Sequence, residues 1–211
     1  MGANVDWRLA KGVTRMVLVR HGQPVEEARG RCYGRLDVGL SSSGRVQAEH
    51  AARFLAEAPL SRVYASPLRR AVESAAPLAQ LKGLAVDTEA AFQELDFGLL
   101  EGLTYEEVEK RYPEVFAEWM AYPTRVRFPE GESYPELRER VSSAARALRS
   151  RQAGETFVLV SHGGVNRTLL AEALGLPDAH LFRLEQGYSA VNIIDFHGDV
   201  PIVKLMNMTF G

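Results

Sequence analysis

Two apolar runs of the sequence each end in a histidine that is followed by glycine. The run 17–19 leads into Arg20 and His21, and the run 156–160 leads through a serine into His162. Short apolar runs closed by glycine are typical of buried strands, so both histidines are expected at the carboxyl ends of strands. In open α/β sheets, ligands bind at that edge. We therefore expect the two histidines to lie together at one edge of a sheet.

Arginines and an acid are expected at the same edge. Arg69 and Arg70 stand where a strand at 63–66 turns into a helix at 68–81. Cations in a first turn oppose the helix dipole, which suggests that they are needed there. Glu94 lies in a segment too broken by glycines and acids for a helix or strand. Guanidinium forks match phosphate oxygens in pairs, and glycines let peptide N–H groups approach an anion. These groups predict a phosphoryl-transfer pocket that works without a metal.

Composition limits the other classes of function. The chain has 211 residues, 46% apolar and 25% charged, with a formal net charge of -2. This is typical of one soluble globular domain, and it offers no basic surplus for nucleic acid or an anionic membrane. Cys32 is the only cysteine, which excludes an intramolecular disulfide and a cysteine-based metal cluster. No apolar run approaches the ~20 residues of a membrane span. We expect a cytoplasmic protein.

The alternation of elements predicts the fold class. We expect strands at 17–19, 63–66, 84–86, 156–160, 191–196 and 202–206, and helices at 44–58, 68–81, 104–111, 114–121, 135–152 and 165–174. Such alternation favours a three-layer α/β/α sandwich with a mostly parallel central sheet. Residues 1–15 are predicted to be a flexible leader and residues 16–211 a single domain. The proline- and aromatic-rich insertion at about 103–135 is predicted to form a small helical lid over the strand ends.

Four segments together resemble a known family. Leu18-Val19-Arg20-His21-Gly22 resembles the signature of the histidine phosphatase superfamily, in its phosphoglycerate mutase-like branch. Residues 66–71, 94–98 and 160–164 are similar to the other motifs of that family and occur in the same order. The resemblance covers about residues 16–210. It implies a phosphoglycerate mutase-like fold.

The resemblance also implies a role for each residue of the proposed site. His21 would attack phosphorus in line and become a phosphohistidine. Arg20, Arg70 and His162 would hold the three equatorial oxygens, whose charge such a site must stabilise. Glu94 would protonate the leaving oxygen and then act as base on the hydrolytic water. No metal and no cofactor are implied. The wider phosphate- and substrate-binding set that we expect comprises Gly22, Gln23, Gly163, Tyr33, Arg35, Arg69, Tyr105 and Tyr188.

The choice of substrate stays open at this point. Mutases of the family often carry an asparagine where Glu27 stands, and they have a basic, proline-rich insertion that is missing here, so a hydrolase is favoured. Residues 30–38 and 182–188 resemble the α-ribazole phosphatase branch, which acts in cobalamin assembly. α-Ribazole 5′-phosphate is therefore the first-choice substrate, and a broad-specificity or sugar-phosphate phosphatase is the alternative. A phosphoglycerate mutase or a non-catalytic phospho-ligand-binding module is less favoured. The expected partner is a small phosphate monoester, and a homodimer is compatible with the sequence.

Overall fold

A mixed sheet forms the centre of the molecule. The computed structural model describes residues 5–210, and its sheet has the strand order β3-β2-β4-β1-β5-β6. The strands are β1 (Val13–Arg20), β2 (Leu60–Ala65), β3 (Val86–Thr88), β4 (Thr156–Ser161), β5 (Val191–His197) and β6 (Val200–Met208). The first four run parallel, whereas β5 is antiparallel to β1 and β6 is antiparallel to β5. The predicted, mostly parallel sheet is confirmed.

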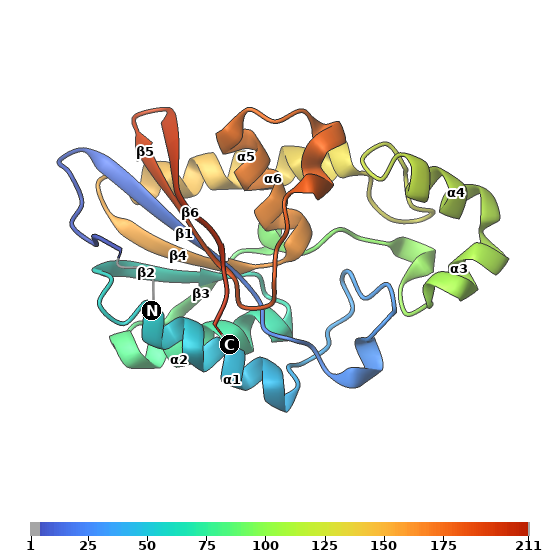
Figure 1. Ribbon diagram of the computed structural model, residues 1–211, viewed down its shortest axis with the longest axis horizontal. Helices are drawn as coiled ribbons and strands as arrows, with labels where there is room; N and C mark the ends of the chain where they lie inside the picture. The colour runs from blue at the N-terminus through green and yellow to red at the C-terminus, as the bar shows by residue number, and fades with distance from the viewer. Residues whose placement is uncertain (1–4, 211) are drawn as a thin grey trace.

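Helices cover both faces of this sheet. They are α1 (Ser42–Phe54), α2 (Arg69–Lys82), α3 (Tyr105–Arg111), α4 (Pro113–Ala121), α5 (Tyr134–Arg151) and α6 (Gly163–Leu174). Figure 1 shows α5 and α6 on one face and α1 and α2 on the other. Along β1, Met16 and Leu18 belong to the core on the α5 side, whereas Val17 and Val19 belong to the core on the α1 side. A strand buried on both faces has no polar alternation, which explains the continuous apolar run in the sequence.

The order of the strands places the two histidines beside each other. β1 and β4 are parallel neighbours, and the register pairs Arg20 with Ser161. The peptide N–H of His21 donates to the Ser161 carbonyl at 2.9 Å. Since His162 directly follows Ser161, both histidines emerge at the same edge of the sheet. β2 lies on the other side of β4 and brings Ser66 to that edge as well.

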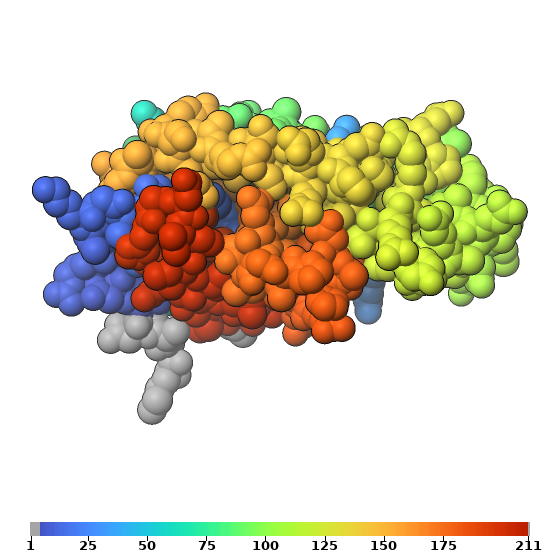
Figure 2. All heavy atoms as spheres, turned by 90° about the horizontal axis from the view of Figure 1, so that it is seen from above, coloured from blue at the N-terminus to red at the C-terminus, as the bar shows by residue number. Residues whose placement is uncertain are grey.

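The insertion at 103–135 forms one end of the molecule. α3 and α4 lie beyond the end of α5, away from the exposed β6 edge (Figures 1 and 2). The ring of Trp119 stacks on Tyr105 at 5.3 Å between centroids and contacts Phe97 and Phe128 edge-on or tilted at 5.4 and 5.2 Å. This aromatic cluster is a small core of its own. It fixes the insertion beside the strand ends.

Several boundaries differ from the predictions, and three of the differences are informative. β1 begins at Val13, so residues 13–15 belong to the sheet and not to a leader. The sequence did not indicate that residues 13–15 are part of the strand, because Arg15 is charged and its ion-pair partner Asp195 lies far along the chain. Within the predicted leader, the ring of Trp7 packs against that of Phe54, with 6.0 Å between the ring centroids. Residues 1–4 of the leader lie outside the described residues. α1 ends at Phe54 and not at residue 58. β3 begins two residues later than predicted, because Leu84 follows the C-cap Gly83 of α2 and its N–H donates to the Ala79 carbonyl at 2.9 Å.

Candidate active site

The imidazole of His21 is held as a neutral nucleophile. Its side chain is buried, and Nδ1 lies 2.7 Å from the Gly22 carbonyl oxygen. A carbonyl can only accept, so Nδ1 carries the proton and Nε2 keeps its lone pair. Burial first, and then the charges of Arg70 and Arg20, lower the pKa of His21 well below its ordinary value. The tautomer that an attack on phosphorus requires is therefore the one present at neutral pH.

His162 is prepared as a hydrogen-bond donor. Its ring lies 5.2 Å from that of His21, and its Nε2 lies 2.8 Å from Ser66 Oγ. That oxygen accepts the Leu68 N–H at 3.3 Å, so the hydroxyl hydrogen is free to donate to Nε2. The proton of the neutral ring is then on Nδ1, which is buried and has no partner among residues 5–210. Burial and the Arg70 charge lower the pKa of His162 well below its ordinary value.

Arg20 is oriented by neutral groups. It is the last residue of β1, and its Nη1 donates to the Gln186 carbonyl at 2.6 Å. Its Cζ lies 4.2 Å from the ring centroid of Tyr188, which is a cation–π contact. Its Nε is buried without a hydrogen-bond partner in the described part of the chain. The guanidinium is thus fixed in place with donor capacity left for a ligand.

Arg70 is fixed in a similar way. It is fully buried in the first turn of α2 and donates to the carbonyls of Leu36 and Gly34 at 2.7 and 2.5 Å. The ring of Tyr33 lies 5.0 Å from its Cζ. Burial lowers the pKa of Arg70, and its Nε also lacks a partner within residues 5–210. Three groups from different elements, His162, Arg20 and Arg70, thus lie around His21 as expected for a phosphate site.

Peptide N–H groups hold the carboxylate of Glu94. Its Oε1 accepts the Leu95 N–H at 2.9 Å, and its Oε2 accepts the Gly164 N–H at 3.0 Å in the first turn of α6. A helix N-terminus favours negative charge, which explains the position of this acid. A Cβ on Gly164 would collide with the carboxylate. Gly164 therefore leaves the space that the Glu94 carboxylate occupies.

A cavity of about 230 Å³ lies between the insertion and the catalytic residues Arg20 and Glu94, whereas His21, Arg70 and His162 lie outside its lining. Of the residues expected to bind substrate, Tyr33, Tyr105 and Gly163 line it, together with Arg20 and Glu94. Tyr33 reaches both regions, because its ring also lies 6.3 Å from that of His21. Burial raises the pKa of its hydroxyl to about 12, so the phenol stays neutral.

The remaining expected residues have other neighbours. The Arg69 side chain pairs with Glu73 one helical turn later at 2.7 Å, and Arg35 pairs with Asp96 at 3.1 Å. Neither lines the cavity. The peptide N–H of Gln23 donates to the Gln47 side chain at 2.9 Å, the Gly22 N–H donates to Ser74 Oγ at 2.9 Å, and Tyr188 stacks on Arg20. The structure thus gives these residues supporting contacts around the catalytic groups.

Sequence reasoning missed several residues that line this cavity, including Arg31, Trp119, Arg167 and Phe182. For Arg167 a signal was present. It lies on the predicted helix 165–174, four residues after Gly163, and because α6 in fact begins at Gly163 both lie on one helix face. The others come from the loop after β1, from the insertion and from the 3₁₀ segment Asp178–Arg183, and their positions depend on tertiary packing.

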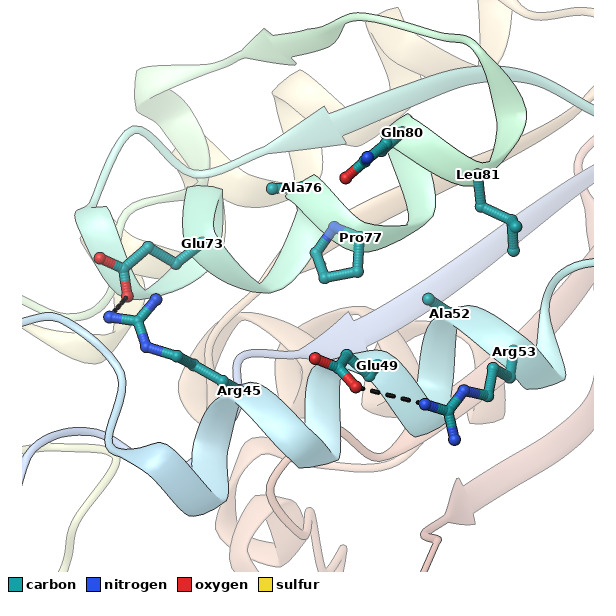
Figure 3. A pocket seen from close by; sticks show the side chains of 9 residues that line it. All are labelled: Arg45, Glu49, Ala52, Arg53, Glu73, Ala76, Pro77, Gln80 and Leu81. Carbon is teal, nitrogen blue, oxygen red and sulfur yellow. Dashed lines mark hydrogen bonds and ion pairs between the residues drawn. The ribbon is translucent and has the colours of Figure 1, made fainter.

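The largest cavity of the described residues lies elsewhere. It is an open groove of about 780 Å³ between α1 and α2 (Figure 3). Its charged side chains are paired with each other, Arg45 with Glu73 and Arg53 with Glu49, both at 3.3 Å. None of the predicted catalytic residues lines it. The smaller cavity beside Arg20 and Glu94 is therefore the candidate active site.

Comparison with known proteins now identifies the family. The model of the histidine phosphatase superfamily (branch 1) matches residues 16–209. The chain belongs to this superfamily. Phosphoserine phosphatase 1 of Hydrogenobacter thermophilus is 31% identical over 197 residues, which is 93% of each chain. The prediction of a phosphoric monoester hydrolase is thereby confirmed at the level of the family.

Two solved phosphatase structures share this fold. A mycobacterial glucosyl-3-phosphoglycerate phosphatase is 28% identical with a TM-score of 0.82, covering 93% of this chain and all of the other. The α-ribazole phosphatase of Shigella flexneri is 23% identical with a TM-score of 0.86, covering 93% and 98%. The second likeness bears on the fold alone. Within residues 5–210, no helix is long and apolar enough to cross a membrane.

Proposed function

We propose that this histidine phosphatase is a metal-independent phosphomonoesterase that forms a phosphohistidine at His21. One observation carries the proposal. The neutral His21 ring lies beside Arg20, Arg70 and His162, and each of these has a buried nitrogen without a partner among the described residues. A phosphoryl group offers three equatorial oxygens to three such donors.

The reaction has two in-line steps. In the first, the Nε2 lone pair of His21 forms the P–N bond while the P–O bond to the leaving group breaks. Glu94, which enters this step protonated, gives its proton to the departing oxygen and is left as a carboxylate. In the second step, water attacks phosphorus, the P–N bond breaks, and Glu94 takes a proton from the water. The Gly22 carbonyl accepts a hydrogen bond from the Nδ1–H group throughout and stabilises the positive charge on the phosphorylated ring.

The charge balance supports a reaction without a metal. The guanidinium groups of Arg20 and Arg70 supply the positive charge that a divalent ion supplies in other phosphoryl-transfer sites. Both are held by carbonyl oxygens and aromatic rings, so their charge is not cancelled by protein carboxylates.

Two substrate candidates follow from the cavity. Tyr105 and Trp119 form an aromatic wall on which the base of α-ribazole 5′-phosphate could pack. This ester remains our first-choice substrate from the sequence, and with it a place in cobalamin assembly. The alternative is a broad-specificity or sugar-phosphate phosphatase, which the cation of Arg167 in the same cavity favours. A cytoplasmic location and a homodimer also remain proposals.

A hydrolysis screen tests this function. We expect the protein to release phosphate from p-nitrophenyl phosphate and from at least one natural monoester, with equal rates in the presence and absence of EDTA. An α-ribazole phosphatase should prefer α-ribazole 5′-phosphate to sugar phosphates and phosphoglycerates. Turnover of that ester no faster than of p-nitrophenyl phosphate would reject it as the substrate. Loss of all activity in EDTA and its recovery with a divalent ion would overturn the metal-free mechanism.

A further inference from the structure

Arg167 carries a charge that the protein itself leaves unpaired. It lies on α6, is partly buried, and lines the candidate active-site cavity. Its Nε donates to the Leu184 carbonyl at 2.7 Å, and its Cζ lies 5.7 Å from the ring of Phe182. No carboxylate within residues 5–210 forms an ion pair with it. The proposed mechanism does not use this guanidinium.

Other arginines in similar surroundings are paired. Arg140 is held by Glu132 at 2.6 Å beneath the Glu94 segment. Arg31, on the wall of the same cavity, has Glu107 at 3.6 Å. A partly desolvated cation without an ion-pair partner is costly, and the carboxylates of Glu94 and Glu185 offset this cost only from a distance. Burial and the nearby charge of Arg20 lower the pKa of Arg167, which is the sign of that cost.

The place of Arg167 indicates what it contacts. A Cβ on Gly163 would lie 2.9 Å from Arg167 Nη1 and 3.5 Å from Arg20 Nε, so both guanidinium groups lie against the same glycine. In the proposed mechanism, the three equatorial oxygens already have Arg20, Arg70 and His162. Each of these oxygens thus has a donor of its own without Arg167, which leaves the Arg167 guanidinium available to another group. It is positioned for a different part of the same substrate.

We propose that Arg167 binds a second anionic group of the substrate, a carboxylate or a second phosphate, attached close to the phosphate monoester that is cleaved. The inference rests on the proposed phosphatase function and narrows its substrate class. The planar fork of arginine suits either anion, since both present two oxygens to it. α-Ribazole 5′-phosphate has no second anionic group, so this substrate class favours the alternative candidate.

A pair of esters of similar size tests the inference. 3-Phosphoglycerate and glycerol 3-phosphate differ in a carboxylate and a neutral hydroxymethyl group. We expect the kcat/KM of the wild-type protein to be about 10- to 100-fold higher for 3-phosphoglycerate, as expected for one charge-assisted interaction. In Arg167→Gln this ratio should fall to near one, mainly through a higher KM for 3-phosphoglycerate. Arg167→Lys keeps the charge and should recover part of the ratio.

Matched controls separate this effect from general damage. Arg138→Gln removes an exposed arginine outside the cavity, paired with Asp178 at 3.0 Å, and should leave the ratio unchanged. Fructose 1,6-bisphosphate against fructose 6-phosphate repeats the comparison for a second phosphate and identifies which anion is preferred. Thermal melting of each variant reports whether the fold is retained.

The outcomes are distinct for the two proposals. A wild-type ratio near one in both ester pairs, or an equal fall for both members of a pair in Arg167→Gln, would overturn the role of Arg167. Absence of hydrolysis of every ester, p-nitrophenyl phosphate included, would defeat the proposed function instead. Titration calorimetry with 3-phosphoglycerate and glycerol 3-phosphate then still decides the matter. Arg167→Gln should weaken binding of the first and not of the second, and equal binding of both by the wild type would contradict the inference.

Discussion

The two ends of β1 treat an arginine in opposite ways. Arg15, near the start of the strand, donates to both oxygens of Asp195 at 2.6 and 2.8 Å and to the Asp6 carbonyl at 3.0 Å. Arg20, at the other end, has a carbonyl and the face of Tyr188 but no carboxylate in the described part of the chain. The two arginines are five residues apart on one strand. The charge of Arg15 is neutralised by a carboxylate, whereas the charge of Arg20 has no ion-pair partner within residues 5–210.

This difference indicates which end of the strand binds an anionic ligand. At the amino end of the sheet, a bidentate pair completes the packing and leaves nothing to react. At the carboxyl end, Glu94 is the only acid among residues 5–210 that lines the cavity, and it is bound by peptide N–H groups and not by an arginine. The arginines there keep their charge available. A buried arginine with hydrogen bonds only to neutral groups is therefore a more useful marker of this site than cavity size.

Removing Arg20, the arginine without an ion-pair partner among the described residues, should have the largest effect on activity. We expect Arg20→Ala to lower kcat for p-nitrophenyl phosphate by about 10³- to 10⁵-fold, because one charged donor to the transferred phosphoryl group is lost. Its melting temperature should be equal to that of the wild type or higher, since an unpaired charge is removed. Steady-state kinetics and thermal melting measure the two quantities. A loss of activity below tenfold would show that Arg20 is not a phosphate ligand.

Breaking the ion pair of Arg15 with Asp195 should instead lower stability and leave activity unchanged. Asp195→Ala leaves Arg15 buried without its partner and should cost about 3–5 kcal/mol of unfolding free energy. The fraction that stays folded should keep the wild-type kcat. The double variant Arg15→Met/Asp195→Leu removes both charges and serves as control, with stability near that of the wild type in urea unfolding. A double variant as unstable as the single one would mean that packing, and not the charge, explains the loss.

A methyl group introduced at Gly164, beside the Glu94 carboxylate, should slow the reaction less than the loss of Arg20. Gly164→Ala pushes the Glu94 carboxylate from its position and should reduce kcat by about 10²-fold, within the range of general acid catalysis. Alkyl phosphates, whose leaving groups need a proton, should lose more activity than p-nitrophenyl phosphate. Rates measured with both esters make this comparison. Equal losses would place the proton donor on another residue.

The pH dependence of stability should show the smallest effect. Native His21 and His162 stay neutral because their pKa values lie well below the ordinary 6.5, whereas the unfolded chain takes up protons near that pH. Stability should therefore be complete above about pH 6.5 and should decrease as the pH falls below it. Between pH 7.5 and 5.5 each histidine should contribute a loss of about 1 kcal/mol. Urea unfolding at both values measures it, and His162→Gln should show about half of this part of the loss.

Much of the fold and the core of the site could be predicted from the sequence. Apolar runs on a strand buried on both faces are continuous, and the motifs around His21 and His162 are short and local. Arg15 could not be placed, because its partner Asp195 lies on a strand from the other end of the chain. Arg35 and Arg69 were expected to contact substrate, yet each finds a carboxylate nearby in space. Which arginines remain unpaired is decided by tertiary packing, which sequence spacing does not contain.

The central claim is the phosphohistidine at His21. Rapid mixing with a ³²P-labelled phosphate monoester, quenched once with alkali and once with acid, tests it directly. The label should stay on the protein after alkali, be lost after acid, and be absent from His21→Ala. A protein-bound label that survives acid, or one that forms equally in His21→Ala, would contradict the account.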